Sequence, residues 1–143
     1  HTIDHHRGSE EQQFGEEYFD PEEYDDIKKR VDTLPTLKRN IEINGLSKSI
    51  NAVVGYSKQI ANDMQNNIDL VFIDGSHTFE SARTDYSSWK DKIRIGGILA
   101  IHDVYDSELE GGQAPREIYE KALSENFDLI KRVDSLVALQ KIV

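Results

Sequence analysis

The sequence contains no cysteine and no long apolar segment, and each absence narrows what the chain can be. Without cysteine, there is neither a disulfide framework nor a zinc site built on thiolates. No apolar run approaches the roughly 20 residues of a transmembrane helix, and the first residues do not form a basic and apolar signal peptide. We therefore expect a cytoplasmic protein with no membrane contact.

Basic residues are also scarce, since 17 Lys and Arg stand against 27 Asp and Glu and give a formal net charge of -10. A surface of this sign repels a phosphate backbone, so we expect no nucleic-acid partner. What the chain does have is 143 residues and 37% hydrophobic content, enough to bury a core. The expectation is a single domain over residues 1–143.

The apolar residues alternate between strand-like and helix-like patterns along the chain. The segments with strand character are "HTID", "SINAVVG", "IDLVFID", "GGILAIHDV", "FDLIKRVD" and "LVALQKIV". Helical spacing predicts helices over 34–41, with a stop at Gly45, over 57–67, over 79–93 and from Pro115 onward. The acidic segment 7–26 is predicted to be a loop, with a short helix near 21–30. Alternating strands and helices indicate an α/β fold with helices on both faces of a parallel sheet, closed by an antiparallel hairpin.

Polar side chains stand where the predicted strands end. In open α/β sheets the ligand site lies at the carboxyl ends of the strands, and the residues at these ends are Asp4, Ser57, Asp74, His77, His102 and Asp103.

The "DGSH" stretch has two interpretations. In one, Asp74 and Ser76 cap the following helix and His77 is an ordinary surface residue. In the other, Asp74 meets Asp103 from the next parallel strand. Two carboxylates at one sheet edge repel each other unless a divalent cation lies between them, which makes a metal site the second hypothesis.

The segment "DLVFIDGSHTFESARTDYSSWKDKIRIGGILAIHDV" resembles the fourth and fifth strands of class I S-adenosylmethionine-dependent methyltransferases. It is most similar to a subgroup with D-G-x-H after strand four, which includes metal-dependent O-methyltransferases of sugars and small molecules. "TLKRNIEINGL" and the final hairpin extend the resemblance over nearly the whole chain. The resemblance implies a Rossmann-like, doubly wound, mostly parallel sheet with a C-terminal antiparallel hairpin.

The resemblance also implies roles for individual residues. Asp4 corresponds to the acid that binds the cofactor ribose, and Ser57 to an adenine contact. Asp74 belongs both to the expected cofactor contacts and to the metal ligands, together with Asp103, while His77 corresponds to the proposed general base. His102 stands where the subgroup has an acid, and imidazole is a poor magnesium ligand, so His102 is a metal ligand, an alternative base or a structural residue. The implied cofactors are S-adenosylmethionine and a magnesium or manganese ion.

The expected activity is methyl transfer to an oxygen of a small molecule or sugar. A metal-dependent hydrolase using Asp74, His77, His102 and Asp103, and a noncatalytic binding module, remain alternatives. The family's first strand and glycine-rich loop have no counterpart, because the sequence starts at the "HTID" that matches strand two. We therefore expect an N-terminally truncated domain whose two exposed sheet edges favour self-association.

Overall fold

The computed structural model describes every residue from His1 to Val143. The chain forms two compact units, His1–Ile60 and Ala61–Val143. Their compactness does not test whether both belong to one domain, so the single domain remains a prediction. None of the helices is long and apolar enough to cross a bilayer.

The first unit contains a parallel pair of strands, β1 (Thr2–Asp4) and β4 (Ala52–Val54), in which Asp4 lies opposite Val54. Between them in sequence lies α1 (Leu34–Ile43), which begins on a proline turn. The helix ends as its sequence predicts, because Gly45 adopts a positive φ of 67° and the N–H of Leu46 turns back to the Ile41 carbonyl at 2.9 Å.

The predicted helix over 21–30 is wrong beyond its first turn. A 3-10 turn covers Pro21–Glu23, and a small antiparallel pair follows, β2 (Tyr24–Asp25) with β3 (Arg30–Val31); a second 3-10 turn lies upstream at Glu10–Gln12. The Asp25 carboxylate accepts the backbone N–H groups of Ile27 and Lys28 at 3.0 and 2.9 Å. Such local bonds satisfy the backbone in a turn and compete with the helix.

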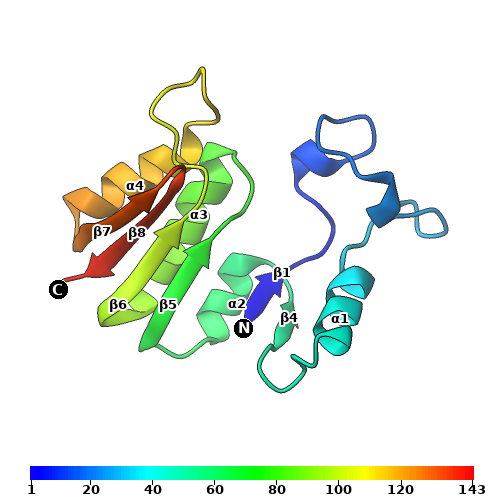
Figure 1. Ribbon diagram of the computed structural model, residues 1–143, viewed down its shortest axis with the longest axis horizontal. Coiled ribbons are helices and arrows are strands. Elements are labelled where there is room, and N and C mark those ends of the chain that lie inside the picture. The colour runs from blue at the N-terminus through cyan, green and yellow to red at the C-terminus, as the bar shows by residue number, and fades with distance from the viewer. The chain divides into compact units, whose positions relative to one another are not determined.

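The second unit is built on a four-stranded sheet in the order β5-β6-β8-β7 (Figure 1). Strand β5 (Ile68–Ile73) pairs parallel with β6 (Ile93–Ile101), and β8 (Leu136–Lys141) pairs antiparallel with both β6 and β7 (Phe127–Val133). The sheet therefore combines a parallel half with the predicted C-terminal hairpin. Strands β1 and β5 belong to separate sheets.

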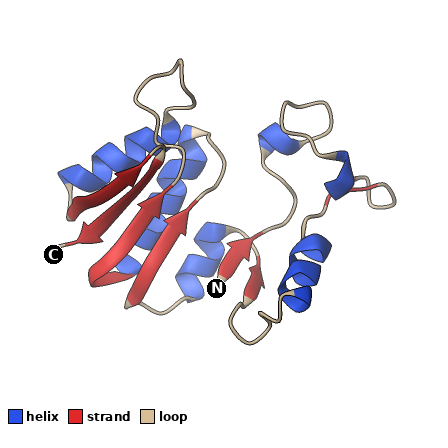
Figure 2. Ribbon diagram, viewed as in Figure 1, coloured by secondary structure: helices blue, strands red, loops and turns tan.

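Two helices, α3 (Phe79–Trp89) and α4 (Ala114–Ser124), cover one face of this sheet (Figure 2). Their apolar sides and the facing strand residues make the core, whose largest fully buried side chains are Tyr86, Ile93, Leu99, Ile101, Val104, Ile118, Val137 and Leu139. Leu70 and Phe72, which project from β5 on the other face, are 56% and 51% exposed.

Two helix boundaries and the buried face of one helix also differ from the sequence prediction. Helix α2 (Ser57–Asp63) is four residues shorter than expected. Helix α3 ends at Trp89, a 3-10 turn follows over Lys90–Lys92, and Ile93 starts strand β6 instead of extending the helix. In α4, Ile118 and Ala122 are buried as predicted, whereas Leu123 is exposed.

Candidate functional site

The candidate site lies where β5 and β6 end together. Ile73 and Ile101 are register partners at the ends of these strands, and the His102 N–H donates to the Ile73 carbonyl at 3.1 Å. Asp74 and the His102–Asp103 pair therefore leave the sheet side by side. The sequence predicts this proximity, because adjacent parallel strands deliver their carboxyl ends to one edge.

Four of the predicted residues form one cluster, in which two imidazoles contact the Asp103 carboxylate. Nε2 of His77 and Nδ1 of His102 each lie 3.1 Å from Oδ2 of Asp103. The same His102 nitrogen lies 3.6 Å from Oδ1 of Asp74. A carboxylate only accepts hydrogen bonds, so Nε2 of His77 is the donor in its contact with Asp103.

Asp103 is the most enclosed member of this cluster, with 18% of its side chain exposed against 51% for Asp74. Burial alone would raise the pKa of the Asp103 carboxyl. Contact with His102 and a hydrogen bond from the Tyr105 hydroxyl outweigh this effect, so its pKa lies below the ordinary value. Asp103 is therefore an anion at neutral pH and is able to hold a cation or an imidazolium.

The helix-cap interpretation of "DGSH" is wrong for Asp74, whereas the Ser76 hydroxyl supports the cap by accepting the N–H of Thr78 at 3.3 Å. The N-cap of α3 is Thr78, whose hydroxyl accepts the N–H of Ser81 at 3.3 Å. Helix α3 has the cap it needs without Asp74. The position of the Asp74 carboxylate at the sheet edge thus has no capping role to explain it.

The donor atoms of Asp74, His102 and Asp103 fit a metal ion. One ligand atom from each lies within 4.8 Å of the other two. Nδ1 of His102 is buried and makes no well-directed hydrogen bond, although two carboxylates stand near it. A cation among these atoms would satisfy the nitrogen and relieve the repulsion between the two acids.

Two further residues at this site were not singled out by sequence. The Tyr105 hydroxyl donates to Oδ1 of Asp103 at 3.0 Å, from a loop position with no sequence signal. Asp85 on α3 lines the small pocket formed by Asp74, His77, His102 and their neighbours. The sequence offers no signal for Asp85, because a carboxylate next to a buried residue is ordinary on an amphipathic helix.

The two remaining predicted residues, Asp4 and Ser57, lie in the first unit. Asp4 ends β1 and Ser57 begins α2, just beyond β4, so both lie at the same end of the β1–β4 pair. The Asp4 side chain is half exposed, and its Oδ1 accepts the His6 N–H at 2.8 Å. The ring of His5 contacts Tyr56 with centroids 4.9 Å apart, and His6 is buried with Nδ1 2.7 Å from the Thr33 hydroxyl.

Solved structures share this fold. The O-methyltransferase NovP matches 99% of this chain and 59% of its own length, with a TM-score of 0.61 and 16% identity. The methyltransferase PaMTH1 of Podospora anserina, solved with SAH bound, covers 77% of this chain with a TM-score of 0.59 and 13% identity. A methyltransferase from Geobacter sulfurreducens covers 78%, with a TM-score of 0.58 and 16% identity. The chain spans 56% and 54% of the last two structures, just over half their length.

These matches define the fold class as the Rossmann-like α/β fold of class I methyltransferases. A family model described as a methyltransferase domain matches residues 1–104, which include every residue of the candidate site except Tyr105. The chain therefore belongs to this methyltransferase domain family.

Proposed function

We propose that this chain takes part in S-adenosylmethionine-dependent methyl transfer to a hydroxyl oxygen of a small molecule or sugar, assisted by a divalent metal. The observation that carries the proposal is the convergence of Asp74, His77, His102 and Asp103 at one sheet edge of a methyltransferase domain. When bound, S-adenosylmethionine supplies a methyl group on a positively charged sulfur, which an aligned oxygen nucleophile attacks directly.

His77 is proposed to be the general base. Its Nε2–H is directed at Oδ2 of Asp103, and the imidazole is proposed to take the proton from the acceptor hydroxyl. The Asp103 carboxylate fixes the tautomer and stabilises the imidazolium that forms. Because the pKa of Asp103 is low, the carboxylate remains charged throughout.

Asp74, His102 and Asp103 are the proposed metal ligands. A divalent cation held there would polarise the acceptor hydroxyl and lower its pKa. Two carboxylates with one imidazole favour manganese over magnesium, because magnesium prefers an all-oxygen shell. His102 then acts as a ligand through Nδ1 and not as a second base.

Asp4 and Ser57 are proposed to contact the adenosine part of the cofactor. The half-exposed Asp4 carboxylate at the end of β1 offers acceptors to both ribose hydroxyls. The exposed ring of Tyr56, beside Ser57, supplies an apolar surface next to the same strand end. The small-molecule acceptor is the proposed partner, and the net charge of -10 disfavours nucleic acid.

Thermal unfolding with S-adenosylhomocysteine, Mn²⁺ and Mg²⁺, each alone and in pairs, tests the proposal. Stabilisation by S-adenosylhomocysteine that increases with Mn²⁺ is the expected result, since ligands of the folded state raise the melting temperature. Stabilisation by metal alone would instead favour the hydrolase. No response to any of the three would favour a noncatalytic module.

A further inference from the structure

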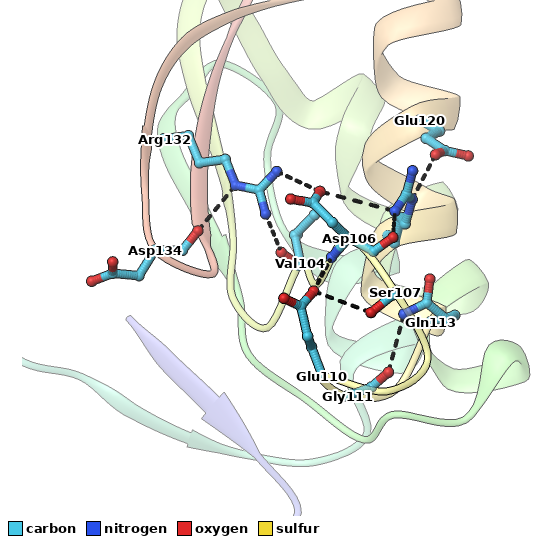
Figure 3. Close-up of polar contacts among 10 residues, drawn as sticks. Val104, Asp106, Ser107, Glu110, Gly111, Gln113, Glu120, Arg132 and Asp134 are labelled. Atoms are coloured by element: carbon cyan, nitrogen blue, oxygen red, sulfur yellow. Dashed lines mark hydrogen bonds and ion pairs between the residues drawn. The ribbon is translucent and has the colours of Figure 1, made fainter.

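The side chain of Arg132 on β7 reaches across to the loop that follows β6 (Figure 3). Its guanidinium donates to the Val104 carbonyl at 2.9 Å and to Oδ1 of Asp106 at 2.8 Å. A third bond, to the Asp134 carbonyl at 3.0 Å, anchors the same side chain to the β7–β8 turn. Arg132 thus holds both neighbours of Tyr105.

Asp106 is fixed from a second side as well. Arg116 of α4 donates to the Asp106 backbone carbonyl. The Asp106 N–H donates to Glu110 at 3.2 Å (Figure 3). Contact with Arg132 holds the pKa of the Asp106 carboxyl below its ordinary value, so the ion pair is complete at neutral pH. The loop is therefore held to α4 and to the C-terminal hairpin at the same residue.

The backbone just before this loop is strained. Asp103 adopts a left-handed φ of 55°, which a residue other than glycine keeps only where its surroundings enforce it. The enforcing contacts lie at Val104, whose N–H donates to the Ser135 carbonyl at 2.8 Å and whose carbonyl accepts from Arg132. Both bonds come from the β7–β8 hairpin, which is distant in sequence.

Tyr105 connects the fixed backbone of this loop to the side chain of Asp103. It stands between the two residues that Arg132 holds, and its hydroxyl bonds Oδ1 of Asp103 at 3.0 Å. The other oxygen of Asp103 faces His77 and His102. A rotation of the carboxylate away from Tyr105 would therefore also change its alignment with both imidazoles.

We propose that Arg132 is a positioning residue of the site: by holding Val104 and Asp106 it keeps Tyr105 in place, and Tyr105 orients the Asp103 carboxylate toward His77. Arg132 itself touches neither His77 nor Asp103. The inference rests on the proposed function for its catalytic meaning. The effect of Arg132 on the His77 tautomer can be tested whether or not the proposed function holds.

A double-mutant cycle tests the link. Arg132→Met, Tyr105→Phe and the double variant are compared with wild type by two readouts: the tautomer of neutral His77 from its ring ¹⁵N shifts, and Mn²⁺ affinity by calorimetry. We expect wild type to hold the Nε2–H tautomer and each single variant to lose part of it. Loss of a group that supports a ligand lowers metal affinity about 10-fold or more. The double variant should lose no more of the tautomer or of the Mn²⁺ affinity than the more strongly affected single variant, because both changes interrupt the same chain of contacts.

Arg94→Met is the matched control. Nε of Arg94 on β6 donates to Oδ1 of Asp69 on β5 at 2.6 Å, away from the strand ends that carry the site. It should leave both readouts unchanged. If Arg132→Met does not fold, Asp106→Asn gives the same comparison, because it weakens one of the contacts of Arg132 with the loop.

Three outcomes separate the explanations. If Arg132→Met lowers the free energy of unfolding but leaves the His77 tautomer and Mn²⁺ affinity as in wild type, Arg132 is only structural and the inference is overturned. Additive effects in the double variant would also overturn it, because Arg132 would not act through Tyr105. If wild type binds no Mn²⁺ yet the tautomer follows the expected cycle, the metal part of the proposed function fails and the inference stands.

Discussion

A single methyl group at Gly111 should disturb the site through Tyr105. An alanine Cβ there would lie no more than 3.0 Å from ring carbons Cγ, Cδ2 and Cε2 of Tyr105, where carbon atoms normally stay about 3.5 Å or more apart. The ring must therefore move by roughly 1 Å. Its hydroxyl now lies 3.0 Å from Oδ1 of Asp103, so a shift of this size takes the pair beyond the limit of about 3.2 Å for a hydrogen bond.

The free energy lost with this hydrogen bond can be estimated from the charge of the acceptor, Asp103. A hydrogen bond to a charged group contributes about 1.5–3 kcal/mol, and the lower end applies to Asp103, because water can partly replace the hydroxyl at a site that is not fully closed. About 1.4 kcal/mol corresponds to a tenfold change in an equilibrium constant. We expect Gly111→Ala to weaken Mn²⁺ binding about tenfold and to shift the His77 tautomer as Tyr105→Phe does.

Calorimetric titration with Mn²⁺ and ¹⁵N spectra of the histidines measure both effects. Gly112→Ala is the control, because its added Cβ would make only an ordinary 3.5 Å contact with Cβ of His77. Equal Mn²⁺ affinity and equal His77 spectra for wild type and Gly111→Ala would refute the reasoning. So would an equal loss in Gly112→Ala, since the effect would then come from loop stiffness and not from Tyr105.

Four further predictions concern the site, the core, pH and association. Asp74→Asn should weaken Mn²⁺ binding at least tenfold and change the unfolding free energy by less than about 0.5 kcal/mol, because Asp74 is half exposed and caps no helix; unchanged calorimetric binding would remove it from the ligand set. Leu99→Ala should cost about 2–5 kcal/mol in urea unfolding, since Leu99 is fully buried, and a loss under 1 kcal/mol would contradict its place in the core. The hydrogen bond from Lys90 lowers the pKa of Glu125, so its stabilisation is present above the ordinary value of 4.5 and is lost as pH falls through the lower folded value; the stability difference between wild type and Glu125→Gln should shrink toward pH 3, and a constant difference would argue against the pair. Phe72→Lys should reduce any self-association seen by sedimentation, because Phe72 is a half-exposed apolar side chain on β5; unchanged association would place the contact elsewhere.

The sequence alone determined the order and type of the main elements. Strand β5, strand β6 and the final hairpin carry apolar patterns that are local properties of the chain, and each forms in its predicted place, although β6 already begins at Ile93. Helix α1 also ends at its predicted glycine. The meeting of Asp74 with Asp103 followed from the same patterns, because two adjacent parallel strands must end at one sheet edge.

The tertiary structure alone decided which face of the second sheet is covered and how the site is held. The sequence shows that Leu70 and Phe72 are apolar, but their exposure depends on which elements pack against β5. No sequence pattern in the loop after β6 predicts that Tyr105 bonds Asp103. Nor does any pattern predict that Arg132 binds the carbonyl of Val104, which lies 28 residues earlier in the chain. Such contacts depend on the path of an irregular loop and on side-chain rotamers, which are set by packing among distant segments and leave no repeating signal in the sequence.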